Sequence, residues 1–252
     1  MCGIVGYVGH RQALDVVVEA LRRMEYRGYD SAGVAIVDGN GTVAVERKAG
    51  RLANLEAELA EAGADAFAGS TGIGHTRWAT HGGPTDRNAH PHSDDTHKVA
   101  VVHNGIIENF APLRAELEAE GVEFRSDTDT EVAVHLVARA YATGATAGDF
   151  VQSALAVLRR LEGHFTLVFT HADHPGVVVA ARRSTPLVVG VGDGEMFVGS
   201  DVAAFIEHTR DAVELGQDQV VVITADGYTI TDFDGNEQPG RPFHIDWDLA
   251  AA

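Results

Sequence analysis

Residues 165–170 read Phe-Thr-Leu-Val-Phe-Thr, and this stretch is the best guide to the fold. Apolar residues stand at neighbouring positions in it instead of alternating with polar ones, which is typical of a strand buried on both faces. The same texture recurs at 176–181, 187–191, 195–199 and 219–224. The sequence therefore predicts strands from sheets that are covered on both sides.

Turn signals between these runs indicate hairpins. Asp193-Gly194 and Asp226-Gly227 suit the positive φ angles of tight turns, and so does Asn40-Gly41 earlier in the chain. Further short strands are predicted where apolar or β-branched residues cluster, at 2–8, 31–39, 42–48 and 99–102. Antiparallel pairing follows from connections this short.

Five segments carry apolar residues three or four positions apart, the spacing of a helix with one buried face. They lie at 11–25, from Leu52 to Gly63, from Asn109 to Gly121, from Thr128 onwards and from Asp149 to Gly163. Asn109 and Asp149 suit helix N-caps, and Thr128 with Glu131 has capping-box spacing. An α+β fold is predicted, in which two antiparallel sheets pack together with helices outside.

Composition and charge narrow the class of protein. The chain has 252 residues, of which 45% are hydrophobic and 22% charged, as in ordinary globular proteins. No apolar run approaches the roughly 18 residues of a membrane helix. A formal charge of -18 opposes binding to nucleic acid and to anionic membranes. With no leader sequence and one cysteine, a cytoplasmic location is expected.

Cys2 is the only cysteine and directly follows Met1. Removal of Met1 would give one residue both a thiol and a free α-amine, whose ordinary pKa of about 7.7 to 8.0 allows it to take up the thiol proton. Attack of the thiol on an amide follows from that pair. A lone cysteine is a small buried hydrophobic residue about as often as it is a nucleophile, so its position alone leaves both interpretations open.

Four segments carry more polar groups than a structural frame requires, namely 26–33, 74–82, 102–109 and 126–131. The Asn104 amide and the Gly105 backbone N–H suit an oxyanion hole for a tetrahedral intermediate. Arg77 offers a bidentate fork for a carboxylate, and Asp129 offers a partner for an ammonium group. Together these groups suit an amino-acid amide as substrate.

Each of these residues also has a purely structural interpretation. Asn104-Gly105 is typical of a tight turn. Asp129, in the first turn of a predicted helix, would stabilise the helix N-terminus. Arg77-Trp78 suits a stacked surface pair, and Arg27 with Asp30 suits a salt bridge. Only the combination of all four segments favours catalysis.

Clustered histidines suggest an alternative, a metal-binding or regulatory module in which Cys2 is buried structure. Six lie between positions 75 and 103: His75, His81, His90, His92, His97 and His103. Neither an HExxH pair nor a second cysteine accompanies them, so the common zinc patterns are not met. We predict no metal and no other cofactor.

These segments resemble the glutaminase domains of class II, N-terminal nucleophile, glutamine amidotransferases. The start CGIVGYVG (2–9) indicates the class. YRGYDSAG (26–33), GHTRWATHG (74–82) and HPH (90–92) indicate the branch that aminates fructose 6-phosphate. The resemblance covers Cys2 to about residue 235 and implies a four-layer αββα sandwich.

The resemblance assigns roles position by position. It implies Cys2 as nucleophile with its own α-amine as base, and Asn104 with Gly105 as the oxyanion hole. Arg77 and Asp129 would hold the α-carboxylate and α-amino groups of glutamine. A loop that closes over glutamine would carry Trp78, which is similar to the gate of an ammonia channel, together with Thr80 and His81. Supporting positions would be Arg27, His90 and His103.

The function implied is hydrolysis of L-glutamine to glutamate and ammonia through a Cys2 thioester. Residues 1–235 would form the glutaminase domain, and 236–252 would begin a linker to a sugar-isomerase domain. That domain would use the ammonia to convert fructose 6-phosphate to glucosamine 6-phosphate, in a parent protein expected to be a homo-oligomer. The nearest alternative is another class II amidotransferase, or an N-terminal cysteine hydrolase acting on a different amide.

Overall fold

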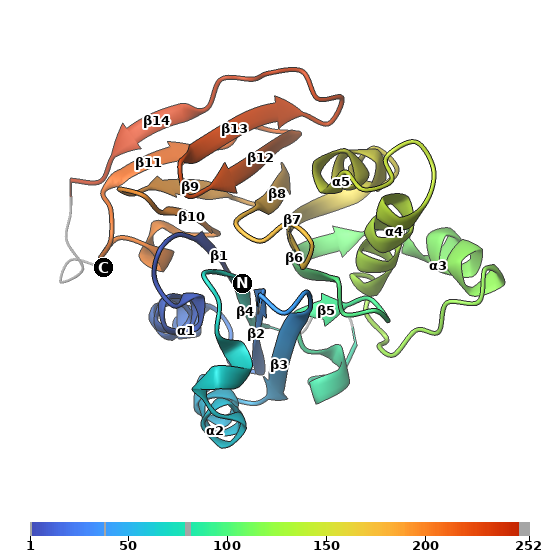
Figure 1. The fold of residues 1–252 in the computed structure, drawn as a ribbon, viewed down its shortest axis with the longest axis horizontal. Coiled ribbons are helices and arrows are strands. Elements are labelled where there is room, and N and C mark those ends of the chain that lie inside the picture. The colour runs from blue at the N-terminus through green and yellow to red at the C-terminus, as the bar shows by residue number, and fades with distance from the viewer. Residues whose placement is uncertain (1, 38, 79–81, 247–252) are drawn as a thin grey trace.

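The structure is a computed structural model that describes residues 2–37, 39–78 and 82–246. Its helices lie on two sides of a pair of sheets (Figure 1). On one side are α1 (Ala13–Met24) and α2 (Leu52–Ala62), and on the other α3 (Phe110–Ala119), α4 (Glu131–Ala142) and α5 (Phe150–Leu158). Among the described helices, none is long and apolar enough to cross a membrane.

All pairings between the described strands are antiparallel. The first sheet has the spatial order β14 (Arg241–His244), β11 (Asp211–Glu214), β9 (Val188–Val191), β10 (Met196–Gly199), β1 (Gly3–Val8), β4 (Thr71–Arg77), β2 (Ser31–Val37) and β3 (Val43–Ala49). The second has the order β13 (Gly227–Asp232), β12 (Gln219–Thr224), β8 (Val178–Arg183), β7 (Gly163–His171), β6 (Val99–Ile107) and β5 (His92–Ser93).

Consecutive apolar residues in one strand serve two different cores. In β7, Val168 packs between the two sheets, whereas Leu167 and Phe169 pack beneath the helices of the second sheet. In β1, Ile4 lies between the sheets and Val5 lies beneath α1. Because neighbouring side chains of a strand point to opposite faces, a run of consecutive apolar residues requires that both faces of the sheet are covered. The layers are therefore helix, sheet, sheet, helix, as predicted.

The linker predicted for 236–252 is wrong for the part of it that the structure describes. Strand β14 pairs with β11, the register placing His244 opposite Asp211. Ile245 is 2% exposed, and its backbone N–H donates to the carbonyl of Arg210. The folded unit therefore extends past residue 235, and residues 247–252 lie outside the described ranges.

Two of the predicted caps differ in the structure. Asn109 occupies the N-cap position of α3, but its side chain bonds the backbone of Arg160 and Glu162. The capping box of Thr128 and Glu131 does not form, because α4 begins only at Glu131. Asp149 does cap α5, accepting the backbone N–H of Gln152 at 2.9 Å, although that helix ends at Leu158 instead of reaching Gly163.

The buried face of α1 gives a direct test of the packing. Leu21 is 0% exposed beneath the first sheet, whereas Leu14 on the same helix is only partly buried. We expect Leu21→Ala to lower the free energy of unfolding in urea by about 2 to 5 kcal/mol, through lost burial and a residual cavity. Leu14→Ala, the matched control, should lose less than half as much. Equal losses would contradict this packing.

Candidate active site

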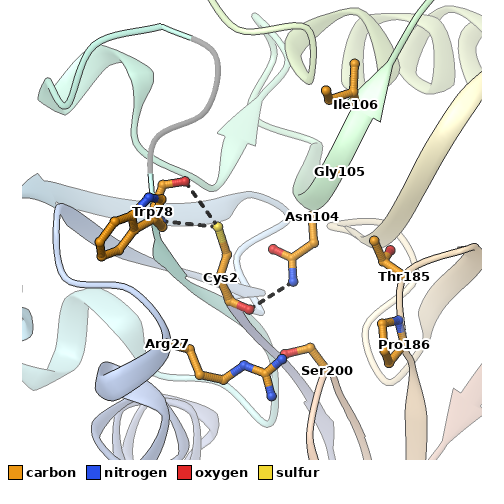
Figure 2. A pocket seen from close by; sticks show the side chains of 9 residues that line it. All are labelled: Cys2, Arg27, Trp78, Asn104, Gly105, Ile106, Thr185, Pro186 and Ser200. Carbon is orange, nitrogen blue, oxygen red and sulfur yellow. Dashed lines mark hydrogen bonds between the residues drawn. The ribbon is translucent and has the colours of Figure 1, made fainter.

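Cys2 stands directly before β1, and Trp78 directly follows the neighbouring strand β4. The backbone N–H of Trp78 donates to Sγ of Cys2 at 3.2 Å, and the Trp78 carbonyl oxygen lies 3.5 Å from the same sulfur (Figure 2). Burial raises the pKa of the Cys2 thiol, and the hydrogen bond from Trp78 offsets only part of that rise. The sulfur is therefore protonated at neutral pH, and its use as a nucleophile requires a base.

Asn104 reaches Cys2 from the second sheet. It lies on β6 opposite Thr166 of β7, and its Nδ2 donates to the carbonyl oxygen of Cys2 at 3.1 Å. Its Oδ1 lies 2.9 Å from Nε2 of His75, which belongs to β4 of the first sheet. The amide is thus held between two residues of the opposite sheet, beside the thiol.

The interpretation of Asn104-Gly105 as a tight turn is wrong. Strand β6 runs from Val99 to Ile107, beyond its predicted end at residue 102, because β7 pairs with it along this whole length. Gly105 has a φ of 117°, and a Cβ there would lie 1.9 Å from the carbonyl oxygen of His164. Only glycine fits this backbone, which leaves residue 105 without a side chain beside Cys2.

Two cavities share Cys2, Trp78 and Gly105 in their linings. The larger has a volume of about 340 Å³ and is completed by the residues labelled in Figure 2, namely Arg27, Asn104, Ile106, Thr185, Pro186 and Ser200. The smaller, of about 30 Å³, is lined by polar groups that include His75, Arg77, His90, His103 and Asp129. The predicted nucleophile, oxyanion donors and charged pair therefore surround one site.

Arg77 ends β4 and is 4% exposed. Its Nη1 and Nη2 donate to the carbonyl oxygens of Gly83 and Gly82 at 3.3 and 3.2 Å. Burial lowers the pKa of the guanidinium, and the carboxylates of Asp30 and Asp129 oppose this shift. An arginine remains charged at neutral pH in such surroundings. Arg77 thus brings a buried positive charge to the site.

Asp129 precedes α4 and does not occupy its first turn, so the predicted helix-terminal role is wrong. The residue is 4% exposed, and its Oδ2 accepts the backbone N–H of Ile107 at 2.7 Å. The same oxygen lies 4.0 Å from Nδ1 of His103. These contacts hold the carboxylate at the end of β6, two residues beyond Gly105.

His90 and His103 form a chain of hydrogen bonds through Thr130. His90 Nδ1 accepts the backbone N–H of His103 at 3.3 Å, so its Nε2 carries the proton that points to Thr130 Oγ1 at 3.3 Å. Thr130 in turn lies 2.8 Å from His103 Nδ1. Burial lowers the pKa of both histidines. They are neutral links between β6 and the segment that carries Asp129.

Arg27 and Trp78 lie at the larger cavity. Nη1 of Arg27 pairs with Oδ2 of Asp201 at 2.5 Å, in place of the salt bridge predicted with Asp30. Trp78 is 48% exposed, and its ring meets that of Tyr29 edge-on at 5.3 Å between centroids. Arg77 is only 4% exposed, so the prediction of a surface pair is wrong for it. Thr80 and His81 lie outside the described residues.

Sequence reasoning missed residues that fix the segment following Cys2 from distant parts of the chain. Ser200 Oγ accepts the backbone N–H of Ile4 at 3.0 Å, and Thr76 Oγ1 accepts that of Gly3 at 3.2 Å. Both hold the start of β1, directly after Cys2. Ser200 has no local pattern that would reveal this role, since it is 196 positions from its partner.

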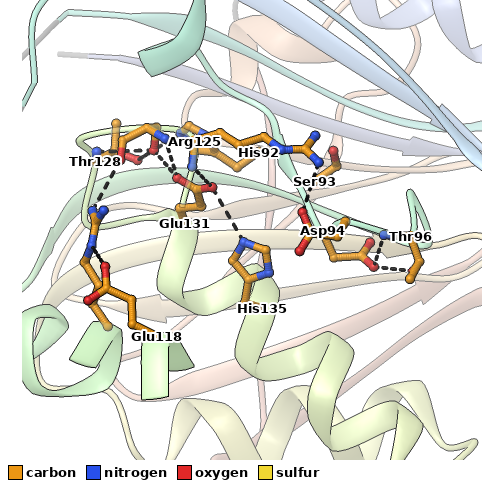
Figure 3. A network of polar contacts seen from close by, with 12 residues as sticks. His92, Ser93, Asp94, Thr96, Glu118, Arg125, Thr128, Glu131 and His135 are labelled. Atoms are coloured by element: carbon orange, nitrogen blue, oxygen red, sulfur yellow. Dashed lines mark hydrogen bonds and ion pairs between the residues drawn. The ribbon is translucent and has the colours of Figure 1, made fainter. Parts of the chain in front are cut away.

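Glu131 is a further residue whose role the sequence did not reveal (Figure 3). Its buried carboxylate accepts the backbone N–H groups of Arg125 and Ser126 at 2.8 and 2.7 Å, and the Ser126 hydroxyl at 2.5 Å. Nε2 of His135 lies 3.5 Å away. Burial alone would raise the pKa of Glu131, but these hydrogen bonds outweigh it and lower the pKa. Glu131 therefore anchors the turn that leads to Asp129.

The buried histidines contact one another and neighbouring polar groups. The ring centroid of His90 lies 4.5 Å from that of His75 and 4.9 Å from that of His92. Within the described ranges, no group of three or more His, Cys, Asp or Glu side chains is arranged to hold a metal ion.

A family profile described as a glutamine amidotransferase domain matches residues 38–234. The chain belongs to the glutamine amidotransferase family. This confirms the family predicted from the motifs.

Curated relatives of this glutamine amidotransferase include two glutamine–fructose-6-phosphate aminotransferases (isomerizing). That of Mycolicibacterium smegmatis is 76% identical across 100% of this chain, which covers 41% of the relative. That of Streptomyces coelicolor is 62% identical, again across 100% of this chain and 40% of the relative. The chain thus spans about two fifths of the length of these relatives.

Solved structures with the same fold include glutamine phosphoribosylpyrophosphate amidotransferase from B. subtilis. Its TM-score is 0.76 at 24% identity, over 94% of this chain and 50% of that one. A structure described as the allosteric regulatory enzyme of purine biosynthesis gives 0.78 at 24% identity, with the same coverage. At this identity the likeness concerns the fold alone, and it agrees with the predicted four-layer sandwich.

The buried histidines predict a stability that depends on pH. Burial lowers the pKa of His75 to about 3 and that of His90 well below its usual value. Unfolded histidines take up protons at pH about 6.5, so stability is full above that value and falls as the pH drops towards the folded pKa. Each such histidine contributes up to about 1.4 kcal/mol per pH unit. Urea unfolding between pH 7.5 and 5 measures this slope.

The matched variants are His90→Gln and His164→Gln, because the His164 side chain is 70% exposed. Only His90→Gln should flatten the dependence of the unfolding free energy on pH. The change should be up to about 1.4 kcal/mol per pH unit, which corresponds to one proton. Stability that stays constant down to pH 5 would refute the account of these histidines.

Glu131→Gln tests the anchored turn. Loss of a buried charge that accepts three hydrogen bonds should lower the free energy of unfolding by about 1 to 3 kcal/mol. Glu118→Gln is the control, since the Glu118 side chain is 50% exposed and pairs with Arg114 within its own helix. It should change stability by less than about 0.5 kcal/mol. Equal effects of the two variants in urea unfolding would show that Glu131 is not an anchor.

Proposed function

We propose that this chain hydrolyses L-glutamine to glutamate and ammonia with Cys2 as the nucleophile. The proposal is carried by the hydrogen bond between Asn104 and Cys2, which come from opposite sheets. The two cavities beside this contact are also lined by Gly105, Arg77 and Asp129. A thiol, an amide donor and two opposite buried charges are what hydrolysis of an amino-acid amide requires.

In the first step, Sγ of Cys2 attacks the side-chain carbonyl carbon of glutamine. Because burial raises the pKa of the thiol, its proton must pass to a base. The α-amine of Cys2 serves as that base once Met1 has been removed. The negative charge that develops on the amide oxygen is stabilised by Nδ2–H of Asn104 and the backbone N–H of Gly105.

The tetrahedral intermediate then collapses to a thioester. The carbon–nitrogen bond breaks, and the leaving nitrogen takes the proton held by the α-amine, so that ammonia is released. Water adds to the thioester with the same amine as base, the carbon–sulfur bond breaks, and the thiol regains its proton. The products are glutamate and free Cys2.

Arg77 and Asp129 select the amino acid. The Arg77 guanidinium would exchange its bonds to the Gly82 and Gly83 carbonyl oxygens for the α-carboxylate. The contacts of the Asp129 carboxylate with Ile107 and His103 are both made by Oδ2. The α-ammonium would bind the other carboxylate oxygen, Oδ1. The small cavity between the two residues must open to admit these groups, because it holds only about 30 Å³.

The remaining predicted residues have less direct roles in the proposal. Trp78, half exposed at the cavity, would cover bound glutamine together with Thr80 and His81 and would gate the exit of ammonia. Arg27 would keep the floor of the larger cavity in place through its pair with Asp201. His90 and His103 would support the segment that carries Asp129.

In a longer protein, the ammonia would be passed on instead of being released. The curated relatives are named for amination of fructose 6-phosphate, and this chain covers 41% of the first of them. We infer that a sugar-isomerase domain follows and forms glucosamine 6-phosphate, in a cytoplasmic homo-oligomer. The chain alone would hydrolyse glutamine without forming an amino sugar.

Substitutions at the site give a graded kinetic prediction. Cys2→Ala should abolish glutamine hydrolysis, by a factor of at least about 10³, since no nucleophile remains. Asp129→Asn should lower kcat/KM by about 30-fold or more, because it removes one partner of a buried charge pair. Ammonia release from glutamine is the assay, on protein whose N-terminus has been checked by mass.

Asp127→Asn is the matched control, two residues from Asp129 but with a side chain 52% exposed. It should leave kcat/KM within about twofold. Full activity of Cys2→Ala, or of a chain that retains Met1, would refute the mechanism. Equal turnover of asparagine or of an acylated amine would refute the assigned substrate.

A further inference from the structure

His75 contacts Asn104 but has no role in the proposed reaction. The histidine lies on β4, fully buried, with its ring centroid 4.5 Å from that of His90. The strand register holds it between Ile4 of β1 and Gly33 of β2. Its position is therefore fixed by a central strand, and not by a loop.

The hydrogen bonds around Asn104 determine which atoms carry protons. The backbone carbonyl of Cys2 can only accept, so the amide nitrogen of Asn104 must face it and the amide oxygen must face His75. Nε2 of His75 is then the donor. A neutral ring then has no proton left for Nδ1.

Burial keeps the ring in this form. It lowers the pKa of His75 to about 3, so that the imidazole carries a single proton at neutral pH. A charged ring would add a second positive group to a space that already contains Arg77. The neutral ring donates one hydrogen bond in one direction.

An asparagine amide needs such a partner, because its terminal torsion is broad and roughly two-fold. If the amide turned over, Oδ1 would face the substrate oxygen on which negative charge develops. The hydrogen bond from His75 disfavours that arrangement and points the N–H groups of Asn104 towards Cys2 and the reacting carbonyl.

We propose that His75 is a positioning residue that orients the Asn104 amide for oxyanion stabilisation, an inference that rests on the function proposed above. It acts through Asn104 and touches no reacting atom. Its loss should therefore lower kcat for glutamine hydrolysis while leaving the KM for glutamine and the reactivity of the thiol in place.

Two variants of nearly equal length separate the hydrogen bond from the packing. His75→Gln keeps an N–H donor and should retain most of kcat, whereas His75→Met has none and should lose about 10- to 100-fold, less than the loss of a whole oxyanion donor. Alkylation of Cys2 by iodoacetamide should proceed at the same rate in both. His171→Gln and His171→Met are the controls, since His171 is also 0% exposed but does not line the Cys2 cavities.

A double-mutant cycle with Asn104→Ala gives the deciding result. In that background His75→Met should cause no further loss of kcat, because there is no amide to orient. If the kcat losses of Asn104→Ala and His75→Met multiply in the double variant, the positioning role alone is overturned. Equal kcat values for His75→Gln and His75→Met would have the same consequence. His75→Asn, whose amide is too short to reach Asn104, replaces His75→Met if that variant does not fold. A normal rate for Asn104→Ala would overturn both this role and the proposed oxyanion hole.

Discussion

The hydrogen bond from Asn104 to the Cys2 carbonyl joins the two sheets of this glutamine amidotransferase, and the site depends on it. Cys2 lies at the start of a central strand of one sheet, and Asn104 lies on a strand of the other. Neither sheet alone contains both the proposed nucleophile and the proposed oxyanion donor. Packing of the two inner faces, which buries residues such as Ile4 and Val168, therefore sets the geometry of the chemistry.

Burial shapes the electrostatics of the same region. It disfavours the thiolate of Cys2 and the charged forms of the surrounding histidines, whereas Arg77 keeps its charge. The site thus contains neutral hydrogen-bonding rings around one opposed pair, Arg77 and Asp129. A zwitterionic amino acid is the natural complement of that pair. A nucleophile that is neutral at rest explains why a base on the same residue would be needed.

Much of this arrangement could be predicted from the sequence, and the failures have physical causes. Consecutive apolar residues indicated doubly covered sheets because strand alternation is a local rule. Asn104-Gly105 has the composition of a turn, yet β7 pairs with β6 through it, so tertiary pairing overrode a local preference. Strand β14 was missed because its residues are exposed and carry no apolar pattern. Ser200 could not be predicted at all, since only the fold brings it to β1.

The proposed mechanism depends on the covalent chemistry of Cys2. The most direct measurement is intact and peptide mass spectrometry after treatment with a chloroketone analogue of glutamine. We predict one adduct, located on Cys2 of a chain that lacks Met1, with protection by glutamine and dependence on both the α-carboxylate and the α-amino group of the analogue. Absence of the adduct, or an adduct formed equally well by an analogue without the α-groups, would contradict the account.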